Sequence, residues 1–103
     1  MKQRMCAIAD LPEGQARVFE VDGVSLAAAR SATKVFVVEN RCSHDDGPLG
    51  EGRVFGGDIE CPRHGARFDL ATGRATRMPA VVPIQTFVAT IEGADVYVEM
   101  DES

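Results

Sequence analysis

The sequence predicts an all-β fold, a small antiparallel sandwich or barrel, and three observations lead to this prediction. Short runs of β-type residues recur along the chain, turns containing glycine separate them, and only one short stretch favours a helix. The chain has 103 residues, too few for two independent cores, so we expect a single domain over 1–103.

The expected strands are defined by alternation of polar and apolar residues and by the turns between them. The run 33–39 is the strongest and is expected to be central, and the helical candidate, Leu26 to Arg30, is too short to stand alone. Turns are expected at Asp22-Gly23, Gly56-Gly57 and Thr72-Gly73. The expected strands are 17–21, 24–26, 33–39, 53–55, 58–60, 68–70, 84–91 and 96–100.

Composition excludes several classes of function. The formal charge is −5 and no basic run is present, which argues against nucleic acid as a partner. No apolar stretch is long enough to cross a bilayer, and the first residues do not form a signal peptide, so we expect a cytoplasmic protein. The acidity is compatible with docking on a basic patch of another protein, or it only maintains solubility.

Two loops rich in turn formers hold almost all the residues suited to chemistry. The first loop contains Cys42-Ser43-His44 and, 16 residues later, the second contains Cys61-Pro62-Arg63-His64. Thiolates and imidazoles are ligands that soft or borderline metals favour. Two adjacent loops of this kind can each offer one sulfur and one nitrogen, as in a two-iron cluster in which two histidines replace two cysteines on one iron.

Other interpretations of these residues remain open at this point. Zinc also accepts two cysteines and two histidines, although its structural sites usually have the two cysteines in one sequence motif and the two histidines in another. A disulfide between Cys42 and Cys61 is disfavoured in a reducing cytosol. Cys6 has no nearby partner in the sequence and is expected to be a buried, inert thiol in a strand.

The chain resembles the Rieske-type [2Fe-2S] ferredoxins. The resemblance rests on the two loop motifs, on Gly47-Pro48-Leu49 after the first, and on Gly65 with Phe68-Asp69 after the second. It implies an all-β Rieske-like fold with two cluster-binding loops and one [2Fe-2S] cluster per chain. By this resemblance the metal ligands are Cys42, His44, Cys61 and His64.

The resemblance also implies residues that cover the cluster or meet partners, namely Pro48, Leu49, Gly65 and Pro79. Respiratory members of the family carry a disulfide between the loops, and a serine and a tyrosine whose hydroxyls bond sulfur. Here the corresponding residues are Gly47, Arg63, Ala66 and Phe68. Fewer donors to sulfur predict a midpoint potential on the order of −150 mV rather than +300 mV.

The predicted function is a soluble one-electron carrier that passes electrons from a flavin-containing NAD(P)H reductase to a terminal non-haem iron oxygenase. It is not expected to be an enzyme, because a mononuclear iron site needs two histidines and the chain has only two, both in the cluster motifs. We expect no nucleic acid, membrane or small-molecule substrate. The alternatives are a fixed Rieske subunit or accessory protein, similar to a nitrite reductase small subunit or linked to cluster assembly, and a zinc-stabilised interaction module.

Overall fold

The structure, a computed structural model, describes residues 1–31, 34–42, 47–50, 52–62, 65–78 and 82–100. Strands dominate this part of the chain, and a 3-10 turn, η1 (Ile8–Asp10), follows the first of them. The strands are β1 (Lys2–Ala7), β2 (Arg17–Val21), β3 (Val24–Ser31), β4 (Lys34–Glu39), β5 (Val54–Phe55), β6 (Asp58–Glu60), β7 (Arg67–Asp69), β8 (Ala75–Arg77), β9 (Thr86–Phe87), β10 (Ala89–Glu92) and β11 (Asp95–Glu99).

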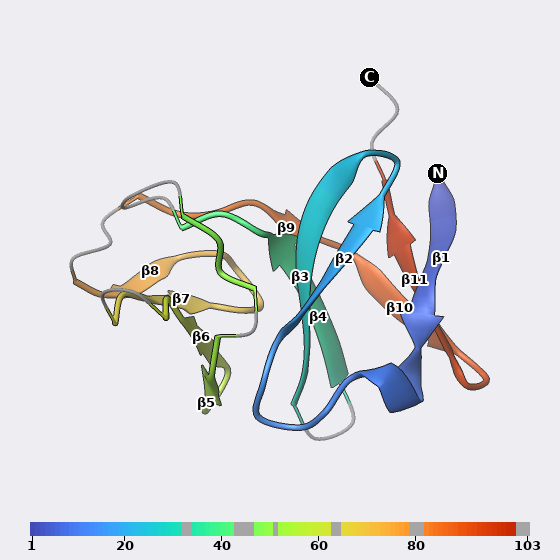
Figure 1. Cartoon of the computed structure of the whole chain (residues 1–103), viewed down its shortest axis with the longest axis horizontal. Coiled ribbons are helices and arrows are strands. Elements are labelled where there is room, and N and C mark those ends of the chain that lie inside the picture. Colours follow the sequence, from blue (N-terminus) through green and yellow to red (C-terminus); the bar gives the residue numbers. More distant parts are fainter. Residues whose placement is uncertain (32–33, 43–46, 51, 63–64, 79–81, 101–103) are drawn as a thin grey trace.

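These strands form three antiparallel sheets, which confirms the predicted all-β class. Their orders are β1-β11-β10, β2-β3-β4-β9 and β5-β6-β7-β8. Figure 1 shows the β5–β8 sheet as a separate lobe at the left, while the other two sheets lie together at the right. Within the described residues, no helix is long and apolar enough to cross a membrane. The assignment of one domain to 1–103 stays a prediction.

The sheet containing β3 and β4 separates two hydrophobic cores. Ala27, Ala29 and Val38 belong to the core on the side of the β5–β8 sheet, while Leu26 and Ala28 belong to the core on the side of β1 and β11. Alternate residues of a strand point to opposite faces, so this sheet is covered on both faces.

The double burial explains why strand β3 continues past residue 26, where the sequence predicted its end. Leu26–Arg30, the helical candidate, lies inside strand β3, which pairs with β2 on one side and β4 on the other. Leu-Ala-Ala-Ala-Arg consists of good helix formers, but here the small side chains let both cores approach the strand closely. Tertiary packing thus overrides the local helix preference.

The predicted strand 84–91 is two strands that serve different sheets. Thr86 and Phe87 pair with β4, whereas the residues from Ala89 onward pair with β11. The break falls at Val88, whose side chain is 64% exposed. A chain that moves from one sheet to another must interrupt its ladder, and the apolar pattern gave no sign of that change.

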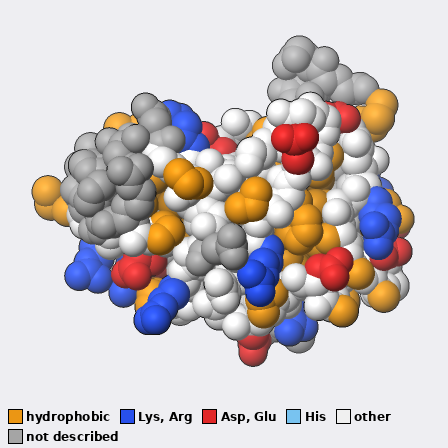
Figure 2. Space-filling model, in the orientation of Figure 1, with side chains coloured by type: hydrophobic (Ala, Val, Ile, Leu, Met, Phe, Trp, Pro, Cys, Tyr) orange, Lys and Arg blue, Asp and Glu red, His pale blue; other side chains and the backbone are white. Residues whose placement is uncertain are grey.

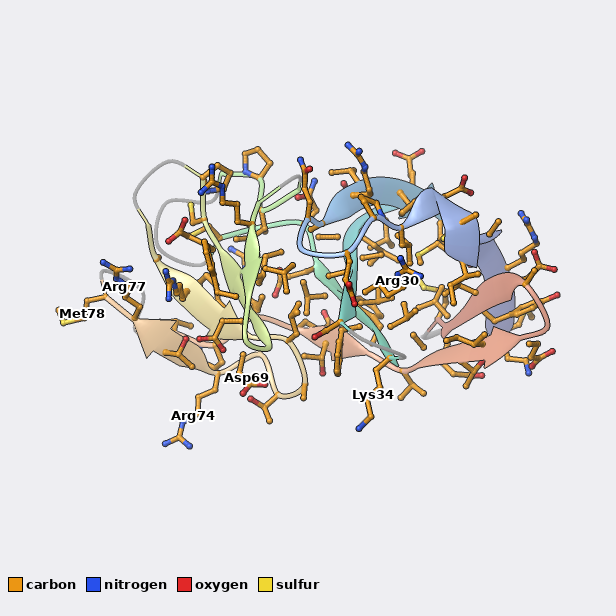
Figure 3. All side chains as sticks on the ribbon, turned by 90° about the horizontal axis from the view of Figure 1, so that it is seen from below. Arg30, Lys34, Asp69, Arg74, Arg77 and Met78 are labelled. Atoms are coloured by element: carbon orange, nitrogen blue, oxygen red, sulfur yellow. The ribbon has the colours of Figure 1, made fainter. Side chains whose placement is uncertain are left out.

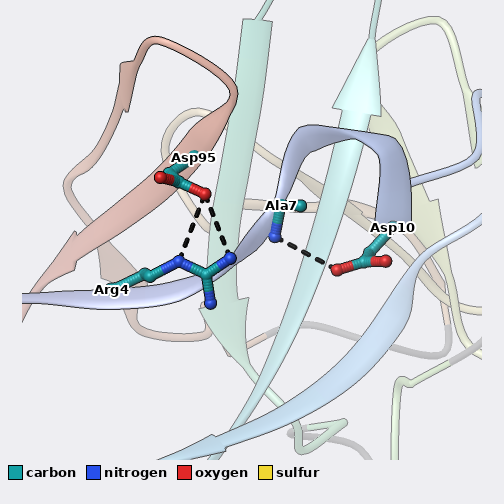
Figure 4. A network of polar contacts seen from close by, with 4 residues as sticks. All are labelled: Arg4, Ala7, Asp10 and Asp95. Atoms are coloured by element: carbon teal, nitrogen blue, oxygen red, sulfur yellow. Dashed lines mark hydrogen bonds and ion pairs between the residues drawn. The ribbon is translucent and has the colours of Figure 1, made fainter.

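At the end of the molecule away from the β5–β8 sheet, polar contacts fix the register of β1 on β11. Arg4 donates to Asp95 from Nε and Nη2, at 3.2 and 3.0 Å, and the Asp10 carboxylate accepts from the backbone N–H of Ala7 at 3.1 Å (Figure 4). The ends of the chain are also paired, because the N–H of Met100 donates to the carbonyl of Met1 at 2.8 Å. The β1-β11-β10 sheet thus forms the end of the molecule opposite the β5–β8 sheet.

We expect Gly73→Ala to destabilise the fold strongly. Gly73 has a φ of +79°, and a Cβ there would lie 2.0 Å from the carbonyl oxygen of Ile84. The substitution would push away the segment that returns to β9, at a cost above the ~1 kcal/mol of a strained φ alone. The control is Gly93→Ala, where φ is +63° and nothing lies within 4 Å of the added Cβ.

Chemical denaturation of both variants measures the difference in the free energy of unfolding. Equal losses of stability in the two variants would contradict the close approach of Ile84 to Gly73.

Candidate metal centre

The two cysteines of the loop motifs lie in one core. Cys42 follows strand β4 by three residues, and Cys61 follows β6 directly. Their side chains are 0% and 1% exposed, and both belong to the same hydrophobic cluster. All three cysteines of the chain are among the described residues, and none is in a disulfide. The fold therefore brings the two candidate sulfur ligands into a common buried region from different loops.

Each of the two loops closes in the same way. The N–H of Cys42 donates to the carbonyl of Gly47 at 2.7 Å, and the N–H of Cys61 donates to the carbonyl of Ala66, also at 2.7 Å. In both cases the bond joins a cysteine to the residue five positions later. The second loop has an additional bond from the N–H of Gly65 to the carbonyl of Cys61, at 3.1 Å.

The same bond therefore follows each cysteine of the two motifs. The residue two positions on in the first loop, and three positions on in the second, is a histidine. Gly65 adopts φ +75°, a conformation that glycine allows without strain, which explains a glycine directly after the second histidine position.

Two residues that the sequence analysis did not select anchor the first loop to the sheet. Asn40 accepts a hydrogen bond at its side-chain oxygen from the N–H of Gly50 at 2.6 Å and donates from its amide nitrogen to the Ser25 hydroxyl at 3.0 Å. Asn40 thus connects Gly50, after the first loop, to strand β3. In the sequence, the only sign of this role is an asparagine two residues before Cys42.

Glu39 makes the equivalent connection to the segment before β9. Its carboxylate accepts from the N–H of Gln85 at 2.5 Å and from Nε of Arg41 at 3.0 Å, and its own N–H donates to the carbonyl of Gln85 at 2.9 Å. Glu39, the last residue of β4, therefore contacts both Arg41, next to Cys42, and Gln85, next to β9.

The remaining predicted site residues fall in different environments. Pro48 is exposed and Leu49 is fully buried, so Leu49 presents no surface to a partner. Its covering role stays a prediction. Gly65 is half-buried. His44, His64 and Pro79 lie outside the described residues, as do Asp45 and Asp46.

The donor set fits the two-iron cluster that the motif implies. Two sulfur donors start two similarly closed turns in one apolar region, and two imidazoles follow them in the sequence. Such a cluster takes up and releases single electrons between its ferric and ferrous states. For such a cluster the chain would supply the two buried cysteine sulfurs and exclude water from them.

Ala66 and Phe68, at the positions where respiratory relatives have hydroxyl groups, are both fully buried beside this region. Their side chains offer no hydrogen bond to sulfur.

Cys6 lies in the other core and does not take part in this site. It is buried on β1, and burial together with the charge of Asp10 raises the pKa of its thiol to about 11. The thiol is therefore protonated at neutral pH, which makes it a poor nucleophile and a poor metal ligand. The interpretation of Cys6 as a buried thiol is confirmed.

Comparison with known proteins identifies the family. Residues 1–88 match the model of the Rieske [2Fe-2S] domain. The chain belongs to the Rieske [2Fe-2S] family. It is 33% identical over 99 residues to the 3-phenylpropionate/cinnamic acid dioxygenase ferredoxin subunit of Escherichia coli K12, covering 95% of this chain and 92% of that protein.

Solved structures give the same result for the Rieske fold. The ferredoxin of carbazole 1,9a-dioxygenase from Nocardioides aromaticivorans IC177 superposes with a TM-score of 0.89 at 31% identity, covering 95% of this chain and 96% of that one. A ferredoxin in complex with the oxygenase of carbazole 1,9a-dioxygenase superposes with a TM-score of 0.85 at 33% identity, covering 94% of this chain and 91% of that one. The Rieske chain is thus an electron carrier of the ferredoxin type and not itself a catalytic component, as predicted.

Proposed function

We propose that the chain binds one [2Fe-2S] cluster, with Cys42 and Cys61 on one iron and His44 and His64 on the other. Support comes from the burial of both cysteines in one core, from the matching closure of their loops, and from the position of a histidine in each motif. Leu49 then covers the buried side of the cluster. Pro48, Gly65 and Pro79 shape its outer edge, where a partner approaches.

We further propose that the protein carries electrons from a flavin-containing NAD(P)H reductase to a terminal non-haem iron oxygenase. The observation that carries this proposal is the full-length similarity to ferredoxins of aromatic dioxygenases, one of which is known in complex with its oxygenase. Diffusion between two partners requires weak and brief contacts, so we expect small interfaces with each. Reducing conditions that keep the thiols available favour a cytoplasmic location.

The test is reconstitution with a dioxygenase reductase, NADH and a terminal oxygenase. We expect the reductase to reduce the cluster, and oxygenase turnover to depend on the concentration of the Rieske chain with saturation. Size-exclusion chromatography should find no stable complex with either partner at micromolar concentrations. A permanent complex with one of them would instead indicate a fixed subunit.

A further inference from the structure

The negative charge of this Rieske chain is concentrated away from the cysteine loops. Residues 41–85, which contain both loops and the β5–β8 sheet, hold six basic and six acidic side chains. The other residues hold five basic and ten acidic side chains, so the entire formal excess of −5 lies outside this segment. The acidity of the whole protein therefore does not describe the surface beside the proposed cluster.

A row of charged residues crosses the β5–β8 sheet next to Cys61. Arg67 is the register partner of both Glu60 on β6 and Arg77 on β8. The Glu60 carboxylate lies 3.2 Å from Nε of Arg67 and 3.9 Å from Nη1 of Arg77. One carboxylate thus faces two guanidinium groups, and this row carries a net positive charge directly beside a proposed cluster ligand.

Arg67 and Arg77 differ in how strongly contacts with neighbouring side chains restrain them. Arg67 also stacks on the ring of Phe55, with its guanidinium carbon 4.4 Å from the ring centre, and it is largely covered. Among the described residues, Arg77 makes only the long contact with Glu60, and its side chain is 58% exposed. Arg77 is therefore the member of the row that is available to another molecule.

Strand β8 presents this arginine at an edge. It is the last strand of its sheet, and Met78 directly after it is 76% exposed. Arg74, in the turn before β8, is exposed, and no ion pair is recorded for it among the described residues. Figure 3 shows Arg77 and Met78 together at one end of the molecule, with Arg74 farther along the same side next to Asp69, and Figure 2 shows basic side chains with acidic ones among them at the lower left.

We propose that Arg74, Arg77 and Met78, the β8 patch, are a docking surface for an acidic face of a protein that exchanges electrons with this chain. The proposal rests on the proposed function and adds the sign of the partner's surface charge. Partner carboxylates bind Arg77 and Arg74, and Met78 offers an apolar contact beside Arg77. The excess negative charge of the residues outside 41–85 repels the same partner face, so charge orients the approach toward the half of the molecule that holds the two cysteine loops.

Two forms of one protein acceptor test this proposal. Native cytochrome c has a basic face around its haem edge, and succinylation makes that face acidic without changing the fold. Each accepts one electron from the reduced Rieske chain, which converts ferric haem to ferrous haem. Stopped-flow rates with the two forms, measured at an ionic strength of ~0.1 M where the Debye length is about 10 Å, give a ratio of succinylated to native rate. Using the ratio within each variant cancels changes in driving force.

We expect Arg77→Glu to lower this ratio about fivefold, since a charge reversal near the site of contact opposes the acidic acceptor and favours the basic one. The matched control is Lys34→Glu, which makes the same charge change at the other end of β4, about 17 Å along the strand from Glu39. It should change the ratio by less than about twofold. Equal effects of the two substitutions, or no effect of Arg77→Glu, would overturn the proposal.

Absorption spectra of each variant show whether a negative result contradicts the β8 patch or the proposed function. A variant with the full cluster spectrum and an unchanged ratio contradicts only the β8 patch. A wild-type protein that never shows a cluster spectrum contradicts the proposed function instead.

Discussion

Cys42→Ser and Cys61→Ser should each abolish cluster binding, with iron content falling from about two per chain to near zero. A serine hydroxyl stays protonated at neutral pH and is a hard oxygen ligand, so it does not replace a thiolate on iron. Both positions lie inside a core that joins the two loops to the central sheet, and loss of the bound group should also lower the thermal stability of the domain.

The matched control is Cys6→Ala, at the one cysteine that lies in the other core. This variant should keep its full iron and sulfide content although it loses some stability from a small cavity. Iron analysis and visible absorption of the three variants measure the effect. Retention of the cluster by Cys42→Ser, or its loss in Cys6→Ala, would contradict the assigned ligands.

Introducing hydroxyl groups at positions 66 and 68 should raise the midpoint potential of the Rieske chain from the low end of the family range. Ala66 and Phe68 are fully buried beside Cys61 and offer no donor to sulfur. A hydrogen bond to a charged group contributes about 1.5 kcal/mol, and tenfold in a one-electron equilibrium corresponds to about 59 mV. We therefore expect Ala66→Ser and Phe68→Tyr to raise the potential by roughly 60 mV each.

Ala75→Ser serves as the control, because Ala75 packs at the border of the same core on β8. Its hydroxyl should leave the potential unchanged within about 20 mV, since it adds no donor to a ligand. Redox titration followed by absorption gives all three values. A wild-type potential well above zero would show that the missing hydroxyl groups do not determine the potential of this protein.

The fold class was predictable because most strands carry a local signal. Arg17–Val21 alternates polar and apolar residues, and Gly56-Gly57 marks a hairpin, so both were found where expected. The differences arose where tertiary structure decides the outcome, in the strand predicted to end at residue 26 and in the single strand predicted over 84–91. Leu26–Arg30 looks helical by propensity, but it is a strand whose small residues allow two layers to pack against it.

The candidate ligands were predictable from the sequence, whereas the residues that anchor their loops were not. The spacing of cysteines and histidines carried the ligand prediction, because few residue types bind such metals and they occur here in pairs. The anchoring roles of Glu39 and Asn40 were not predictable, since each depends on a backbone N–H, from Gln85 and Gly50, brought close by the fold. The burial of Leu49 was likewise decided by packing.

The most direct test of the account is an EPR spectrum of the purified protein after reduction with dithionite, together with iron and sulfide analysis. A Rieske cluster predicts about two irons and two sulfides per chain, and a reduced signal whose average g value lies below that of an all-cysteine cluster. A colourless protein with one zinc, still without signal after anaerobic reconstitution with iron and sulfide, would contradict the electron-carrier account.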